Sequence, residues 1–138
     1  MKNILMLTHG NFADGIKSSL EVICGSDMGV SSLCVSVSDT LETVSAKIKE
    51  YLESCPDNEE KVIITDIPGG STTSAAIHFV NTEKKVYVVT GLNLGLLLEI
   101  VMNQEEDASA AIATIVKNAK ETMLFLNPVM DEQGIKAK

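Results

Sequence analysis

The sequence predicts an α/β domain with an open, mainly parallel, doubly wound sheet. Short runs rich in Val, Ile and Leu alternate along the chain with longer segments whose apolar residues recur every three or four positions. Near-continuous apolar runs are typical of strands that are buried on both faces. The alternation of the two patterns predicts strands connected by helices, and that order builds a parallel sheet with helices on both sides.

Four segments have the composition of buried strands, and each is expected to run in the same direction. They are residues 3–8 (NILMLT), 32–37 (SLCVSV), 61–66 (KVIITD) and 85–90 (KVYVVT). In the common flavodoxin-like strand order 2-1-3-4, the first strand lies beside the third. No internal repeat or linker interrupts this pattern, so the sequence predicts one domain over residues 1–127.

Five segments between and after these strands have helical periodicity. They are residues 11–24, 39–54, 71–80, 94–103 and 108–121. In two of them the apolar residues form one stripe: Phe12, Ile16, Leu20 and Ile23 in the first, and Leu41, Val44, Ile48, Tyr51 and Leu52 in the second. Gly25 is the expected stop of the first helix, Asp39 or Thr40 the expected N-cap of the second, and Asp107 that of the last.

The pattern weakens after Lys120. The apolar run MLFL at 123–126 is expected either to end a helix or to form a short strand at the sheet edge, and residues 128–138 are expected to form a flexible tail. Apolar residues near a chain end require a cover, and a second copy of the chain is the simplest one. The sequence therefore predicts a homodimer.

Composition excludes several classes of function. The chain of 138 residues has a net charge of −8, and its 11 basic residues are all lysines. This balance argues against nucleic-acid binding, which requires a cationic surface. Without arginine, a phosphate group would have to be held by backbone N–H groups, hydroxyls or lysines.

Cysteine usage and hydropathy predict a cytoplasmic location. Cys24, Cys34 and Cys55 are odd in number and form no CxxC pair, so neither a disulfide framework nor a zinc site is expected. The first residues resemble a strand rather than a signal sequence. The most apolar later stretch, residues 91–102, is too short for a bilayer, which requires about 20 apolar residues.

The polar residues that follow the strands are the candidates for chemistry, because parallel sheets bind ligands at the carboxyl ends of their strands. His9 follows the first strand and Asp66 ends the third, so we expect the two side chains to meet. A carboxylate beside a histidine fixes one tautomer by accepting the Nδ1–H bond, and it leaves Nε2 as a free nucleophile or base.

The glycines after Asp66 supply the remaining part of this site. Gly69 and Gly70 allow close approach of the backbone, and the helix that begins near Ser71 directs free N–H groups toward the same edge. Ser71 also suits the N-cap of that helix, a role that does not exclude contact with phosphate. Together these residues favour a phosphorylatable histidine, whose chemistry depends on positioning and charge stabilisation and for which we expect neither metal nor cofactor.

Competing functions on similar folds lack their motifs. The chain contains no GxGxxG turn, no Walker P-loop and no GxSxG sequence. A response-regulator receiver would match Asp66 and Thr90, but Thr8 and His9 stand where its acidic pair would hold Mg²⁺. A flavodoxin would use aromatic residues to sandwich its flavin, and aromatic residues make up only 4% of this chain.

Three stretches carry a resemblance to a known family: THG at 8–10, DIPGGS at 66–71 and TGLN at 90–93. They resemble the mannose/fructose/sorbose-family enzyme IIA domain of the bacterial phosphotransferase system (PTS), over roughly residues 2–126. The resemblance implies a homodimer that takes a phosphoryl group from the phosphocarrier HPr and passes it to a IIB component for sugar uptake. Contact with the membrane would be only through IIC and IID partners.

The same resemblance assigns roles to residues. His9 would be phosphorylated at Nε2, Asp66 would orient it, and Ser71 with the backbone of Gly69–Ser71 would contact the phosphate. In this family a C-terminal strand packs across the dimer, which would account for residues 123–126. The chain departs from the family pattern where an aromatic residue often precedes the glycines and Pro often follows GGS, because Ile67-Pro68 and Thr72 stand there.

Two alternatives remain open at the level of sequence. A related phosphotransfer domain supplies dihydroxyacetone kinases, although its first loop usually differs. A regulatory or binding module could also use the same fold without chemistry. The sequence does not identify a sugar, because the membrane components recognise it.

Overall fold

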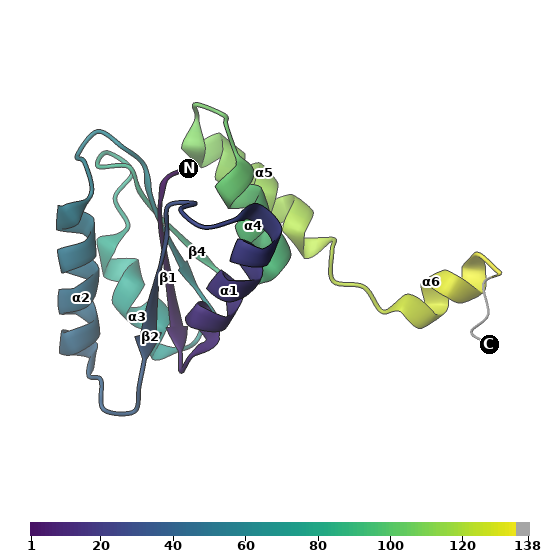
Figure 1. Cartoon of the computed structure of the whole chain (residues 1–138), viewed down its shortest axis with the longest axis horizontal. Helices are drawn as coiled ribbons and strands as arrows, with labels where there is room; N and C mark the ends of the chain where they lie inside the picture. The colour runs from purple at the N-terminus through teal and green to yellow at the C-terminus, as the bar shows by residue number, and fades with distance from the viewer. Residues whose placement is uncertain (135–138) are drawn as a thin grey trace.

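The computed structural model describes residues 1–134, and its centre is a parallel sheet between two layers of helices (Figure 1). The strands are β1 (Asn3–His9), β2 (Val30–Val35), β3 (Lys61–Thr65) and β4 (Val86–Thr90). They are arranged in the order β2-β1-β3-β4, and every neighbouring pair is parallel. The predicted fold class and strand order are therefore confirmed.

Helices cover both faces of this sheet. Helices α1 (Phe12–Cys24), α4 (Leu94–Met102) and α5 (Ala108–Lys120) lie on one face, and α2 (Leu41–Ser54) and α3 (Ser71–Ala76) lie on the other (Figure 1). A short 3-10 turn, Ile77–Phe79, extends α3, and α6 (Leu126–Glu132) follows near the chain end. None of the helices within residues 1–134 is both long and apolar enough to cross a bilayer.

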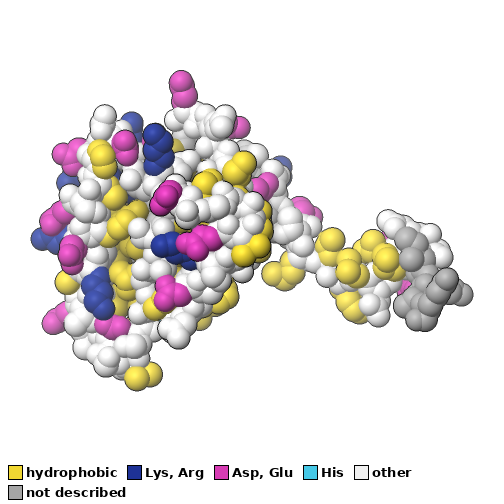
Figure 2. All heavy atoms as spheres, viewed as in Figure 1, with side chains coloured by type: hydrophobic (Ala, Val, Ile, Leu, Met, Phe, Trp, Pro, Cys, Tyr) yellow, Lys and Arg dark blue, Asp and Glu magenta, His cyan; other side chains and the backbone are white. Residues whose placement is uncertain are grey.

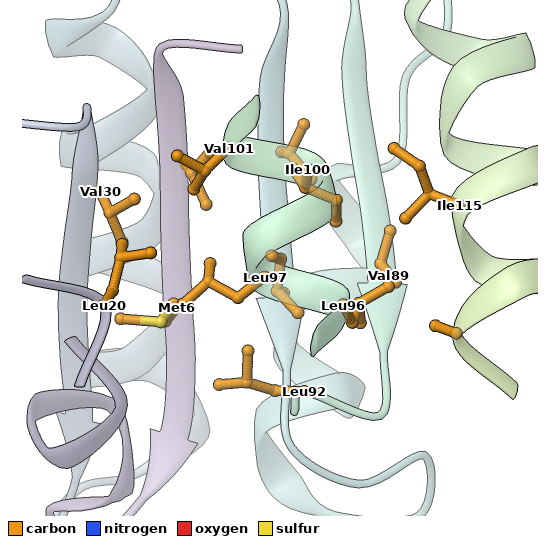
Figure 3. Packing of buried hydrophobic residues seen from close by; sticks show 14 of the residues in the cluster. Met6, Leu20, Val30, Val89, Leu92, Leu96, Leu97, Ile100, Val101 and Ile115 are labelled. Carbon is orange, nitrogen blue, oxygen red and sulfur yellow. The ribbon is translucent and has the colours of Figure 1, made fainter. Parts of the chain in front are cut away.

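The two faces of the sheet form two separate cores, because successive residues of a strand point to opposite sides. Ile4 and Met6 of β1 belong to the core under α1, α4 and α5, whereas Leu5 and Leu7 belong to the core under α2 and α3. Figure 3 shows Met6 in the first core with residues of α1 and α4. This double burial explains why the strands read as continuous apolar runs.

Helix ends follow the residues that the sequence indicated. Thr40 caps α2 in a reciprocal capping box with Thr43, and the Asp107 side chain accepts a hydrogen bond from the Ala110 amide at the start of α5. Gly25 ends α1 with a φ of 84°, a backbone conformation that residues other than glycine rarely adopt. Each cap satisfies backbone groups that the helix itself leaves free.

Strand β2 lies two residues earlier than the predicted segment 32–37. Gly29, at a φ of 72°, passes so close to Lys2 that a side chain would overlap the Lys2 carbonyl, and Val30 begins the strand directly after it. The strand ends at Val35 because the Ser36 amide donates to Asp39 Oδ2 and starts a turn. Val37, predicted in the strand, is fully exposed in that turn.

Two predicted helices differ in detail from the structure. In α1, Ala13 and Leu20 are buried, whereas Phe12 and Ile23 of the predicted stripe are exposed. The predicted helix 71–80 is α-helical only to Ala76 and continues as the 3-10 turn.

The C-terminal segment forms neither the predicted strand nor an extension of α5. Residues 123–125 have no regular structure, and α6 begins at Leu126; within the described part of the chain no strand follows β4. Helix α6 buries no residue and projects away from the domain (Figure 1). Met123, Leu124, Phe125 and Leu126 are exposed, and Figure 2 shows apolar surface along this extension. Residues 135–138 of the predicted tail lie outside the described residues.

Candidate functional site

The site lies at the carboxyl edge of the sheet, where β1 and β3 end side by side. His9 is the last residue of β1, and Asp66 directly follows β3, whose Thr65 is in register with Leu7. After His9 the chain turns sharply, because Gly10 adopts a φ of 57° and its amide bonds to the Val35 carbonyl. The two residues predicted to meet are therefore adjacent.

Asp66 holds His9 at two points. The carboxylate oxygen Oδ2 accepts a hydrogen bond from the His9 backbone amide at 2.8 Å and lies 2.8 Å from the ring nitrogen Nδ1. Because an ionised carboxylate can only accept, Nδ1 carries the proton of the neutral ring and Nε2 keeps its lone pair. The His9 side chain is 44% exposed and that of Asp66 only 13%, so His9 is the more accessible member of the pair.

The second oxygen of Asp66 is fixed as firmly as the first. Oδ1 accepts hydrogen bonds from the Ile67 amide at 3.0 Å and from the Thr72 hydroxyl at 2.8 Å. Burial by itself raises the pKa of Asp66, but the bonds from the His9 amide and ring and from Thr72 outweigh it, and the net pKa lies below the ordinary value. Asp66 is therefore ionised at neutral pH.

Gly70 and Ser71 lie against the other side of the imidazole. A Cβ atom on Gly70 would lie 2.6 Å from Cε1 of His9 and 3.2 Å from Nε2, so only glycine fits beside the ring. The Ser71 hydroxyl lies 3.3 Å from Nε2. The predicted role of Ser71 as an N-cap is wrong, because Gly70 occupies that position and Ser71 is the first residue of α3. Gly69 lies next to these residues, with open space where a Cβ atom would be placed.

Threonines that were not among the predicted site residues form hydrogen bonds in and beside this loop. Besides Thr72, the Thr73 hydroxyl donates to the Ile67 carbonyl at 2.6 Å and pairs with the Thr65 hydroxyl at 2.6 Å. The Ala13 amide at the start of α1 donates a hydrogen bond to the buried hydroxyl of Thr8, which lies in β1. Hydroxyl residues in the first turn after GG were the available signal, but a strand-end pattern alone does not indicate their partners.

The second histidine of the chain lies away from this edge. His78 is exposed and, with Lys61 and Val86 at the starts of β3 and β4, lines a groove of about 560 Å³ at the opposite edge of the sheet. Within residues 1–134, no group of three or more His, Cys, Asp or Glu side chains is placed to hold a metal ion. The chemistry available at the site is that of an oriented imidazole beside donors for an anion.

Comparison with known proteins identifies relatives that span the site. A family described as EIIA-man, "PTS system fructose IIA component", matches residues 3–119. The fructose-specific EIIA component of Bacillus subtilis is 25% identical over 120 residues, which cover 87% of this chain and 80% of that protein. The mannose-specific EIIAB component of Escherichia coli is also 25% identical over 120 residues, but this chain covers only 37% of its length.

A solved structure agrees with these sequence relationships. The crystal structure of the phosphotransferase system component EIIA from Streptococcus agalactiae superposes with a TM-score of 0.83 at 26% identity. The superposition covers 93% of this chain and 99% of that protein. All the residues described at the sheet edge, from His9 to Ser71, lie inside the matched region.

Proposed function

Because the chain belongs to the EIIA-man family, the PTS fructose IIA components, we propose that His9 carries a phosphoryl group from HPr to a IIB component during sugar uptake. The observation that supports this most strongly is the 2.8 Å contact between Nδ1 of His9 and Oδ2 of Asp66. It leaves Nε2 as the nucleophile, and His9 is the more exposed member of the pair. The remaining parts of the proposal follow from what surrounds that nitrogen.

In the proposed reaction, the Nε2 lone pair of His9 attacks the phosphorus of a phosphohistidine on HPr. The new Nε2–P bond forms while the donor's N–P bond breaks, and the electron pair of that bond stays on the donor ring. The His9 ring becomes positively charged, with its proton still on Nδ1. The ionised Asp66 stabilises this charge, and transfer to the IIB component repeats the step with His9 as donor.

The transferring phosphoryl group carries negative charge, and neutral donors would hold it. The Ser71 hydroxyl lies near Nε2, and the backbone N–H groups of Gly69–Ser71 are at the same edge. Each is a donor that needs no net charge, in keeping with a chain that has no arginine. We therefore propose Gly69, Gly70 and Ser71 as the phosphate-binding residues.

We also propose that the protein acts as a cytoplasmic homodimer. The exposed run Met123–Leu126 and the free edge of β4 would be covered together if the C-terminal segment of one copy packed on the other. The net charge of −8 suits partners that present their phosphohistidine among basic residues, because opposite charges steer association. Any membrane contact would be through IIC and IID components.

Phosphorylation by purified components tests the proposal. The protein is incubated with phosphoenolpyruvate, enzyme I and HPr, and we expect acid-labile, base-stable label on His9. The His9→Ala variant should take up no label, and His78→Ala, which changes the exposed histidine at the opposite edge, should be labelled like the parent. If the parent protein takes up no label, a binding or regulatory module becomes the better explanation. Transfer of the label to a dihydroxyacetone kinase rather than to a IIB component would instead favour a phosphotransfer domain that supplies such a kinase.

A further inference from the structure

We propose that Thr72 is a positioning residue, whose hydroxyl holds Asp66 in the orientation that fixes the tautomer of His9. The effect on phosphoryl transfer rests on the proposed function, but the effect on the imidazole does not. The Thr72 hydroxyl donates to Asp66 and makes no hydrogen bond to His9 within the described residues. It would act through the carboxylate alone.

The contacts of Asp66 show what the hydroxyl adds. Oδ2 accepts hydrogen bonds from His9 alone, from its amide and from its ring nitrogen Nδ1. The orientation of the carboxylate plane therefore also depends on the donors to Oδ1. One donor to Oδ1 is the Ile67 amide, which belongs to the next residue and follows the local backbone. The other is Thr72, which belongs to α3 and therefore connects the carboxylate to a separate element.

Burial makes this contact well defined. The Thr72 residue is fully buried, whereas a surface hydroxyl would exchange partners with water. Its Oγ1 lies 2.8 Å from Oδ1, the distance of a strong hydrogen bond to a charged acceptor. No other side chain within the described residues donates to Oδ1.

The neighbouring threonine provides a matched control. The Thr73 hydroxyl donates to the Ile67 carbonyl and pairs with Thr65, and it makes no bond to Asp66. Loss of either hydroxyl removes a hydrogen bond from the same loop. Only loss of the Thr72 hydroxyl frees one oxygen of the carboxylate that orients His9.

The functional consequence concerns the two neutral tautomers of the imidazole. A carboxylate that is free to rotate is a poorer acceptor for Nδ1–H, so more of the ring would carry its proton on Nε2. That tautomer has no lone pair at Nε2 and cannot accept a phosphoryl group. The rate would fall with the population of the competent tautomer.

Nitrogen NMR of the His9 ring measures that population without any phosphoryl donor. Spectra of ¹⁵N-labelled protein are recorded at about pH 9, where an imidazole is neutral, for the parent protein and for Thr72→Val, Thr72→Ser and Thr73→Val. We expect a smaller fraction of the Nδ1–H tautomer in Thr72→Val, and the parent value in Thr72→Ser and Thr73→Val. Thr72→Ala replaces Thr72→Val if the valine variant does not give a folded spectrum.

Labelling through enzyme I and HPr gives the second measurement. We expect Thr72→Val to be labelled roughly tenfold more slowly, as for loss of a hydrogen bond to a charged group, with Thr72→Ser and Thr73→Val close to the parent. An unchanged tautomer in a folded variant without the hydroxyl would overturn the positioning role. A changed tautomer in Thr72→Val, together with a parent protein that takes up no label, would support the positioning role and contradict the proposed function. The two failures can therefore be distinguished.

Discussion

The backbone of Gly70 lies directly against the imidazole of His9, so that a single added methyl group would come within 2.6 Å of the ring atom Cε1. Real side-chain atoms do not approach that closely, and the ring is already tied to Asp66 on its other side. Ring position is therefore determined by the glycine as well as by the carboxylate.

We expect Gly70→Ala to slow phosphorylation of His9 by roughly 100-fold, because a small displacement of a reacting group has about that effect. The initial rate of label uptake from phospho-HPr measures it. Gly69→Ala is the matched control, since open space surrounds that position and its N–H group is kept. Equal rates for the two variants would contradict the close approach of Gly70.

Asp66→Ala should slow phosphoryl transfer by about 100-fold or more, in the range known for loss of a preorganised group that stabilises charge developing in the transition state. The protein should remain folded by circular dichroism, because Asp66 lies at the end of a strand and outside both cores. Asp57→Ala, an exposed carboxylate in the loop before β3, should behave like the parent. Unchanged kinetics in Asp66→Ala would exclude the orienting role.

Acid should weaken the fold partly through Asp66. Its pKa is lowered in the folded state, so the unfolded chain binds more protons near the ordinary pKa of about 4. The stabilisation is present above that pH and is lost as the pH falls through the lower, folded pKa. Urea unfolding of the parent and of Asp66→Asn between about pH 6 and 3 measures the free energy of unfolding. The difference in free energy of unfolding between the parent and Asp66→Asn should become smaller toward low pH.

A second carboxylate sets the background for that measurement. The Ser36 amide and Lys47 lower the pKa of Asp39 to about 2, so Asp39 contributes a pH dependence of the same sign. Comparison with Asp66→Asn removes this shared contribution. A difference between the two proteins that stays constant down to low pH would contradict the lowered pKa of Asp66.

Ser71→Ala should reduce the rate of labelling by roughly tenfold, the effect of one lost hydrogen bond to a charged group. The effect should be smaller than that of Asp66→Ala, because the backbone donors remain. Ser74→Ala removes a hydroxyl from the same helix, one that bonds only to the Gly70 carbonyl, and should leave the rate unchanged. If the two serine variants are labelled equally fast, Ser71 does not contact the phosphate.

Replacement of Leu124 and Phe125 by serine should shift the protein from dimer to monomer. Both side chains are exposed in the single chain. In the proposed dimer they would make apolar contacts, and serine would remove those contacts. Sedimentation velocity at several concentrations measures the mass. The control double variant changes Val22 and Val37, which are even more exposed but lie within the domain, and should leave the mass unchanged. A parent protein that sediments as a monomer would contradict the homodimer.

Much of the fold and the central pair of the site could be predicted from the sequence, because both depend on local patterns. Buried parallel strands must be apolar on both faces, and polar residues after adjacent strands must share one edge, which brought His9 and Asp66 together. The start of β2 was missed because it depends on the close approach of Gly29 to Lys2, far apart in the sequence.

Thr72 and the C-terminal segment could not be predicted for different reasons. The bond from Thr72 to Asp66 depends on how a glycine turn folds back, and residue spacing does not determine that geometry. Helix α6 buries nothing, so no apolar periodicity facing a core could distinguish it from a strand or an irregular end. Side chains without a packing partner leave little signal in the sequence.

The two hydrogen bonds from His9 to one carboxylate have a consequence for the order in which partner proteins would bind. The backbone amide and Nδ1 of His9 are both bonded to Asp66, so in the proposed function Nε2 is the ring nitrogen that accepts and releases the phosphoryl group. A donor protein and an acceptor protein that use this nitrogen must occupy the same space above it. If the proposed function holds, they bind in turn and exclude each other, and the overall exchange follows ping-pong kinetics.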